Sequence, residues 1–317
     1  MSFALRSLVQ FVLVIFAVTV VAFGALNFLG DPLFNILGPA ALEDAGPEFA
    51  EIRADAREQF HLDDPFPIRY ARWVGDMVTG DFGRSYSNQV SVTSILAEKL
   101  PVTVLLMIYA QVISVLISVP WALWSASRAY KPVDKASTVF SFVMLGIPVF
   151  ALSVLLFWLF AIKWQIFPTR YDDSSIGSRL TSLFLPAVAL AIPLIATYQR
   201  LLRTDLISTL QEDFVSVARA KGLPRWFILV RHALRPSLFS LLTVFGIQVG
   251  ALIGGSLIVE RQFQVPGIGF EIVEAIFRDD FPVVLAVVVV VSTVFVAVNV
   301  LVDVLYTFLD PRVKFDG

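Results

Sequence analysis

The chain has 317 residues, of which 57% are hydrophobic and only 16% are charged. This composition excludes an ordinary water-soluble domain, and several apolar runs reach the roughly 20 residues that a helix needs to cross a bilayer. The chain contains no cysteine, which excludes disulfides, thiolate chemistry and cysteine metal sites, and its net charge of −2 is uninformative until the charges are assigned to the two sides of the membrane.

The first predicted element is a transmembrane helix within residues 1–30. Arg6 precedes an uncharged apolar run over residues 7–30. A secretory signal would have an apolar core of only ~7–15 residues and a small-residue cleavage site, so we interpret this run as a retained span.

Residues 31–100 are the one extended polar region. Residues 31–99 hold twelve acidic and six basic residues, a balance that favours the outer side of the membrane. Apolar residues at helical spacing predict two short helices here, which Pro65 and Pro67 separate. We therefore expect an extracytoplasmic helical region between the first and second spans.

Residues 101–317 contain five further apolar runs, which makes six predicted transmembrane helices. The basic turn at Arg128, Lys131 and Lys135 is predicted to be cytoplasmic, and both termini are then cytoplasmic as well. The expected spans cover about 101–127, 136–162 with a Gly-Ile-Pro sequence in its middle, 181–198 with kinks near Pro186 and Pro193, 237–259, and the stretch from Pro282 to about Val302.

The loop over residues 204–236 is a polar island between two apolar runs. Asp213 is a suitable N-cap, and Gly222 followed by Pro224 is a stop signal, so a helix of about nine residues is predicted between them. A helix this short is unstable by itself in water and needs a partner surface. A second helix is expected to begin at Pro224, and the basic residues of the loop predict a cytoplasmic location.

Several segments resemble one family of membrane proteins. The sequence Ala218-Arg219-Ala220-Lys221-Gly222, followed after nine residues by His232-Ala233-Leu234-Arg235-Pro236, resembles the cytoplasmic loop of ABC-importer permeases of the dipeptide, oligopeptide and nickel type. Residues 61–87, residues 259–282 and the C-terminal Leu309-Asp310-Pro311-Arg312-Val313 are similar to the same family, so the resemblance covers essentially the whole chain. Ser216 and Val217 depart from the broader importer signature, which shifts the match toward the peptide subfamily.

The resemblance implies a permease subunit of an ATP-driven importer in the bacterial cytoplasmic membrane, with residues 101–317 as the permease core. It implies a second homologous permease, two ATPase subunits and an extracytoplasmic substrate-binding protein as partners. The solute would be a dipeptide or oligopeptide, or alternatively nickel or another small solute. Within the loop it implies a coupling helix that docks on an ATPase through Phe214, Val217, Ala218, Arg219, Ala220, Lys221 and Gly222.

The chain carries no recognisable catalytic or cofactor motif. It lacks the glycine-rich loop and lysine that hold nucleotide phosphates, so ATP and magnesium are expected on the partner ATPases and not here. His61 and His232 are predicted on opposite sides of the membrane, which prevents them from sharing a metal. We expect neither an enzyme nor a nucleic-acid partner.

Two alternatives stay open at this level. On charge alone, Arg219 and Lys221 would serve anionic lipid as well as a protein partner. An ATPase-independent channel or secondary carrier is the competing functional class, although such carriers usually place carboxylates near the bilayer midplane. The only ionisable residue expected within a span is Asp303, as an end-of-helix carboxylate or as part of the pathway.

Overall fold

The computed structural model describes residues 3–28, 33, 47–59 and 63–309. Within these ranges the chain is helical, and its only β-type pairing is an isolated bridge between Arg84 and Ser91. The chain divides into two compact units, one of residues 1–101 with 271–297 and the other of residues 102–270 with 298–316. Helices α5, α12 and α13 each belong partly to both units.

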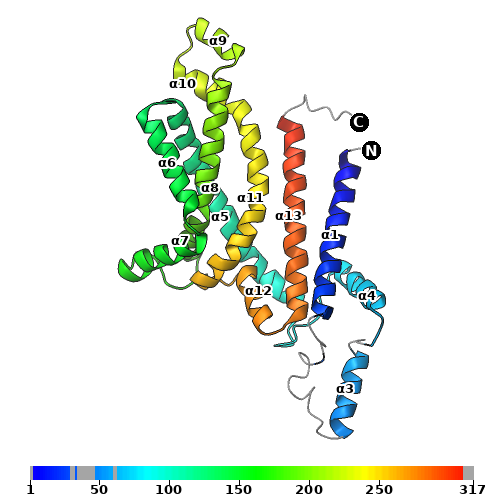
Figure 1. Ribbon diagram of the computed structural model, residues 1–317. Helices are drawn as coiled ribbons and strands as arrows, with labels where there is room; N and C mark the ends of the chain where they lie inside the picture. The colour runs from blue at the N-terminus through cyan, green and yellow to red at the C-terminus, as the bar shows by residue number, and fades with distance from the viewer. Residues whose placement is uncertain (1–2, 29–32, 34–46, 60–62, 310–317) are drawn as a thin grey trace. The chain divides into compact units, whose positions relative to one another are not determined.

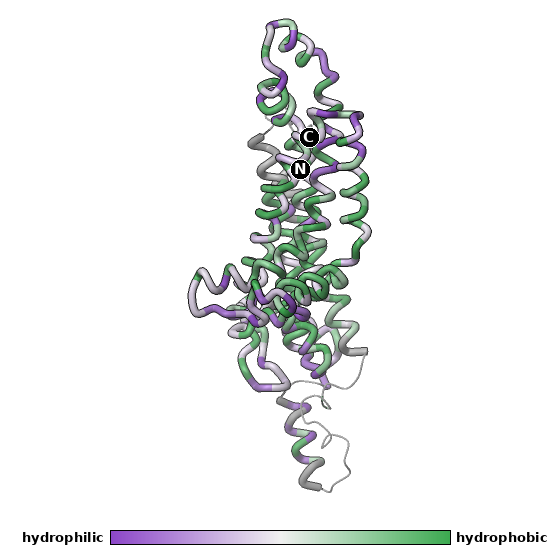
Figure 2. Tube along the Cα trace, turned by 90° about the vertical axis from the view of Figure 1, so that its left-hand side faces the viewer, coloured by the Kyte–Doolittle hydropathy of each residue, from purple (hydrophilic) through white to green (hydrophobic). Residues whose placement is uncertain are grey.

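Four helices in the described ranges are long and apolar enough to cross a membrane. The class of a helical membrane protein is thereby confirmed, whereas the number of six spans and the cytoplasmic termini stay predictions. Figure 2 shows hydrophobic residues along the middle of the long helices and hydrophilic residues toward the helix ends and in the loops. Three of the four are α5 (Val92–Ala126), α8 (Ile176–Thr209) and α13 (Phe281–Leu309) (Figure 1). The fourth is a continuous helix that consists of α10 (Arg225–Phe227), a π-helical turn (Ile228–Ala233) and α11 (Leu234–Phe263).

The span predicted over residues 136–162 is broken in the structure, and its crossing of the membrane stays a prediction. The structure has two helices there, α6 (Pro132–Gly146) and α7 (Val149–Leu156) with a π-helical continuation (Phe157–Lys163), and they meet at 93°. Ile147 has an extended backbone with φ −86° and ψ 119°. A residue before proline avoids the helical region, and Pro148 cannot donate its own backbone hydrogen bond, so the helix breaks at this point.

Helix α8 is the centre of the unit that contains residues 102–270. It stays one helix through Pro186 and Pro193 and ends beyond the predicted position 198. Two buried polar contacts fix it to neighbouring helices: Tyr198 donates to Gln111 Oε1 at 2.8 Å, and Ser141 donates to Gln199 Oε1 at 2.7 Å. Its buried face consists largely of small and aliphatic residues at helical spacing, among them Leu183, Ala187, Leu190, Ala191, Leu194, Leu202 and Leu206.

The other unit contains α1 (Phe3–Phe28), α3 (Pro47–Gln59) and α4 (Phe66–Val78). The two short helices predicted in the polar region are therefore confirmed, while their outer location stays a prediction. Helix α4 packs on α1 through aromatic rings, and Phe23 stacks on Trp73 with ring centroids 5.4 Å apart. A hydrogen bond of 2.8 Å between Thr19 Oγ1 and the Tyr70 hydroxyl adds a polar fixed point.

Candidate coupling site

The short helix α9 (Asp213–Ala220) lies in the loop that joins α8 to α10. The predicted N-cap was wrong by one residue. Glu212 is the N-cap, with an extended backbone and no side-chain capping bond, and Asp213 is the first helical residue. A carboxylate in the first turn still favours the helix, because it faces the positive end of the helix dipole.

Helix α9 buries one face inside the loop itself. Val215 and Ala218 contact Ile228, and Leu210 and Leu223 cover the edges of this small cluster. Ala218 is only 5% exposed. The side chain of Ala218 therefore packs against the following helix of the same chain, and its contact with a partner stays a prediction. The partner surface that a helix of this length needs is supplied on this face by Ile228.

Helix α9 ends in a Schellman motif. Gly222 has φ +78°, its N–H donates to the carbonyl of Arg219 at 2.9 Å, and the N–H of Leu223 donates to the carbonyl of Ala218 at 3.3 Å. This pattern satisfies carbonyls at the helix end and needs a left-handed residue at the turn, which glycine adopts without strain. The predicted stop signal is confirmed.

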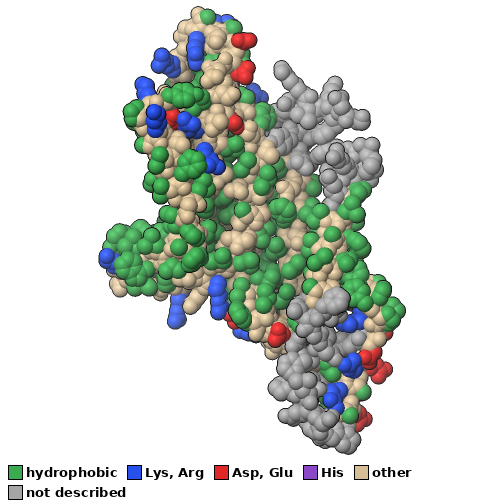
Figure 3. Space-filling model, in the orientation of Figure 1, with side chains coloured by type: hydrophobic (Ala, Val, Ile, Leu, Met, Phe, Trp, Pro, Cys, Tyr) green, Lys and Arg blue, Asp and Glu red, His purple; other side chains and the backbone are tan. Residues whose placement is uncertain are grey.

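The opposite face of α9 is open in the described structure. Phe214 is 47% exposed and Val217 is 54% exposed, and Trp226 on α10 is 61% exposed. Ala220 and Lys221 are exposed as well, while Arg219 donates to the carbonyl of Leu210 at 3.1 Å. Figure 3 shows Lys and Arg side chains scattered among hydrophobic ones at this end. This face offers apolar contact area beside positive charge.

A buried ion pair lies near the C-terminal end of α8. The sequence analysis did not predict it. In the structure Arg203 donates to both Asp134 oxygens, from Nε to Oδ1 and from Nη2 to Oδ2, each at 2.5 Å. Asp134 also accepts from Ser125 Oγ at 2.6 Å and from the Tyr130 N–H at 2.8 Å. One carboxylate therefore joins the end of α5, the turn after it, the start of α6 and α8.

A second buried carboxylate corrects the expectation that Asp303 is the only ionisable residue in the spans. Glu260 is fully buried in α11. It accepts from Thr103 Oγ1 at 2.7 Å and from the N–H of Phe270 at 3.0 Å, at the start of α12 (Ile268–Phe277). Ile268 N–H in turn donates to Thr103 Oγ1 at 2.8 Å. The side chain of Asp303 lies outside the described residues.

The glycines of the segment after α11 are explained by this carboxylate. A Cβ on Gly267 would collide with Glu260 Oε2 and Thr103 Oγ1, and one on Gly269 would come within 2.8 Å of Glu260 Oε2 and of the Leu257 Cα. Only glycine lets the backbone approach the acceptor this closely. Gly267 and Gly269 are therefore turn and packing residues.

In the other unit, a third carboxylate joins two segments that the sequence analysis singled out separately. Asp280, just before α13, is 2% exposed. It accepts from the hydroxyls of Ser85 and Ser87, the latter at 2.9 Å, and from the Tyr86 N–H at 3.0 Å. Residues 85–87 and residue 280 are thus held together, although nearly two hundred positions separate them in the sequence.

Comparison with known proteins identifies the family. Residues 118–315 match the family described as the binding-protein-dependent transport system inner membrane component. This match covers more than half of the chain. The chain belongs to this permease family.

The permease has relatives over nearly its full length. It is 34% identical to a probable peptide ABC transporter permease of Sinorhizobium fredii, over 99% of each chain. It is 31% identical to an oligopeptide transport system permease of Bacillus subtilis, again over 99% of each. A dipeptide transport system permease of Alkalihalophilus pseudofirmus is 30% identical, over 99% of this chain and all of the relative.

The family match includes α9, the Asp134–Arg203 pair and Glu260, but not α1, α3 and α4. The full-length relatives extend the similarity to those helices. Within the described residues no group of three His, Asp or Glu side chains could hold a metal ion. Of the two histidines, His61 lies outside the described residues, and His232 contacts the Phe227 ring with centroids 5.7 Å apart.

Proposed function

We propose that this chain is the permease subunit of an ATP-driven importer of dipeptides or oligopeptides. The observation that carries the proposal is the similarity over nearly the whole length to three permeases whose names specify peptide, oligopeptide or dipeptide transport. The membrane-spanning helices provide the pathway. In this proposal ATP and magnesium bind to the partner ATPases.

The loop over residues 204–236 acts as the coupling loop in this proposal. Phe214, Val217, Ala220 and Lys221 lie on the exposed side of α9 and would meet a groove of the ATPase. Ala218 and Gly222 support the docking indirectly, Ala218 by packing on Ile228 and Gly222 by closing the helix. Arg219 donates to the Leu210 carbonyl, so it ties α9 to the end of α8.

Motion of the ATPase would reach the spans through rigid connections. Ile228 lies in the π-helical turn that continues without a break into α11. Movement of α9 is therefore transmitted to the N-terminal end of that long helix. The Asp134–Arg203 pair holds α5, α6 and α8 together, so we propose that these helices move as one body. Closure of the ATPases on ATP would then open the pathway to the outside.

The proposed assembly places both termini and the coupling loop in the cytoplasm, and residues 31–99 outside. It contains a second homologous permease, two ATPase subunits and an extracytoplasmic binding protein that delivers the peptide. The excess of acidic residues in 31–99 and the basic character of the coupling loop support this orientation.

Reconstitution in proteoliposomes tests the proposal. The complete assembly, with binding protein and ATP, should take up a radiolabelled tripeptide, and omission of the ATPases or replacement of ATP by ADP should abolish the uptake. Uptake by this chain alone would show a channel or secondary carrier. Uptake of nickel ions without tripeptide uptake would move the chain to the other substrate class of the family.

A further inference from the structure

The unit that contains α1, α4 and the start of α13 has a partly open hollow of about 310 Å³. Its charged lining consists of Arg69, Arg72, Asp76, Asp81 and Arg84, and aromatic rings provide most of the rest. None of these residues belongs to the coupling site or to the Glu260 contacts. The hollow is near the lower end of the ~300–1,000 Å³ typical of small-molecule sites, which suits a headgroup or a short peptide.

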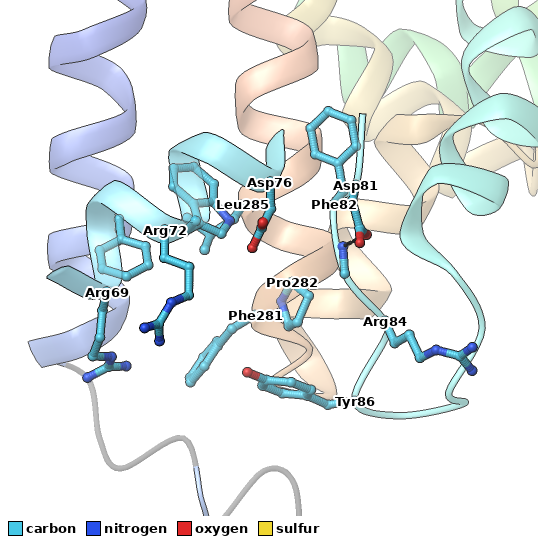
Figure 4. Close-up of a pocket in the computed structure, with 13 residues that line it drawn as sticks. Arg69, Arg72, Asp76, Asp81, Phe82, Arg84, Tyr86, Phe281, Pro282 and Leu285 are labelled. Carbon is cyan, nitrogen blue, oxygen red and sulfur yellow. Dashed lines mark hydrogen bonds between the residues drawn. The ribbon is translucent and has the colours of Figure 1, made fainter. Parts of the chain in front are cut away.

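The charges are arranged in two sets (Figure 4). Arg69 and Arg72 project from α4 on one side of the hollow, and Arg84 points away from them. Asp76 points inward from the same helix toward Pro282, and Asp81 is held by the N–H of Gly83 at 2.8 Å. Arg72 already pairs with Asp64 at 2.8 Å, but a guanidinium has five N–H donors and can bind a second acceptor. A ligand with one anionic and one cationic group matches this arrangement.

Apolar side chains place the hollow at the ends of the apolar stretches of α1 and α13. Phe23 comes from the end of the apolar stretch Phe11–Ala25 of α1, and Leu285 comes from the beginning of the apolar part of α13. Trp73 stacks on Phe23, and Tyr70 contacts the same ring at 5.7 Å. Clusters of Trp and Tyr at the ends of spans mark the depth of the lipid headgroups.

We propose that this hollow binds the headgroup of a zwitterionic phospholipid, with the phosphodiester on Arg69 and Arg72 and the ammonium on Asp76. Guanidinium groups bind phosphate oxygens with two parallel hydrogen bonds, and a carboxylate close by favours an ammonium over a neutral headgroup. The acyl chains would follow the exposed apolar side of α1, where Val12, Leu13 and Val21 are uncovered. A bound lipid would fasten α4 to α1 and to the start of α13.

Tyr86 completes the polar side of the hollow. Burial raises the pKa of its phenol to about 12, although the nearby Arg69 guanidinium acts in the opposite direction. The hydroxyl is therefore neutral at physiological pH and can donate to a phosphate oxygen. Its backbone N–H is already held by Asp280, so the ring is attached to a fixed loop.

A free peptide also carries one cationic and one anionic group. The test therefore distinguishes a bound lipid from a bound peptide. The full chain in detergent micelles would be studied by native mass spectrometry with dioleoyl phosphatidylethanolamine, dioleoyl phosphatidylglycerol, inorganic phosphate and trialanine as probes. We expect one retained phosphatidylethanolamine, weaker retention of phosphatidylglycerol, and no displacement of the lipid by phosphate or trialanine at equal concentration.

Variants locate the site. Arg69→Gln should weaken phosphatidylethanolamine binding by roughly tenfold, the loss of one charge-assisted hydrogen bond, and Asp76→Asn should remove the preference over phosphatidylglycerol. Arg170→Gln, at an exposed arginine outside the hollow, is the matched control and should bind as the wild type does. Thermal unfolding midpoints measured without lipid show that the variants are folded.

Three results would overturn the proposal. Equal lipid retention by wild type and Arg69→Gln would mean that the hollow is not the lipid site. Displacement by trialanine would identify a peptide site. Loss of binding of the extracytoplasmic protein in Arg69→Gln, with lipid retention unchanged, would identify a protein-docking surface. Each result is independent of peptide uptake, so the proposed transport function is tested separately.

Discussion

Gly222 and Ala218 both have to be small, but for unrelated reasons. Gly222 has φ +78° and no neighbour within 4 Å of a hypothetical Cβ, so its constraint is conformational. Ala218 has ordinary helical geometry and is confined by its contacts with Val215 and Ile228. Different substitutions therefore separate the two constraints.

Gly222→Val should misdirect the chain after α9. A side chain with a branched Cβ in the left-handed region is strained by about 1–2 kcal/mol or more, and the turn relieves this strain by changing φ. Substrate-stimulated ATP hydrolysis in the assembled complex should fall several-fold, with normal membrane insertion. Gly222→Asn is the control, because asparagine tolerates this region, and it should keep most of the activity. Equal activity of the two variants would contradict a role for the turn.

Ala218→Leu and Ala220→Arg test the two faces of α9. Leucine at the buried position overpacks the cluster by about 1–3 kcal/mol, so limited proteolysis of the isolated chain should cut the loop faster. Arginine at the exposed position should leave proteolysis unchanged and weaken co-purification of the ATPase. If Ala220→Arg retains the ATPase fully, the exposed face of α9 is not the docking surface.

Helices whose start and end are determined by neighbouring residues could be predicted from the sequence. Spacing of apolar residues, Pro65 with Pro67, and the Gly222 stop signal predicted α3, α4 and α9 closely, because helix formation and termination depend on neighbouring residues. The break before Pro148 was visible as a proline, yet prolines occur inside continuous membrane helices too, as Pro186 does in α8. Sequence alone does not say which proline bends the chain.

The buried carboxylates were not predictable for a different reason. Asp134 binds Arg203, which is 69 positions away in the sequence. Glu260 binds Thr103, 157 positions away, and Asp280 binds Ser85, 195 positions away. No periodic pattern in the sequence pairs residues this far apart, because they come together only when the helices fold against one another. Glu260 was overlooked because the predicted span ended at residue 259, one residue before it.

The joint between α5, α6 and α8 should behave as one energetic unit. Asp134→Ala and Arg203→Ala should each lower thermal stability, because each leaves the other charge largely buried and unpaired. The double variant should lose less than the sum, with a coupling energy of roughly 1–3 kcal/mol. Thr204→Ala, an exposed α8 position whose hydroxyl bonds its own helix, is the control. Strict additivity would mean that the pair contributes no mutual stabilisation.

For the whole molecule, the number of membrane crossings depends on whether the bent pair of α6 and α7 crosses the bilayer. Within the described residues four helices have spanning length, and α6 and α7 add a fifth crossing there if they traverse the bilayer together despite their 93° bend. The apolar stretch Phe11–Ala25 of α1 is shorter than the others. Composition leaves both arrangements possible, because a bent pair is equally compatible with a broken span and with a re-entrant loop.

Cysteine labelling decides this, and the absence of native cysteine makes single introduced residues unambiguous. Asn88, Lys131, Asp173 and Gln211 are all exposed and lie between successive spans. With 31–99 outside, a membrane-impermeant maleimide added to intact cells should label Asn88→Cys and Asp173→Cys, whereas Lys131→Cys and Gln211→Cys should react only after permeabilisation. The neighbouring Ser87 is unsuitable for labelling, because its hydroxyl binds Asp280.

Each pair of neighbouring positions in this series tests one crossing. Opposite labelling of Asn88 and Lys131 means that α5 crosses, and opposite labelling of Lys131 and Asp173 means that the bent pair crosses despite its angle. If Lys131 and Asp173 react from the same side, α6 and α7 form a re-entrant loop, and α8 then carries α9 to the opposite side from the cytoplasmic turn. A coupling loop outside the cell could not meet an ATPase, so this one comparison tests both the topology and the proposed coupling.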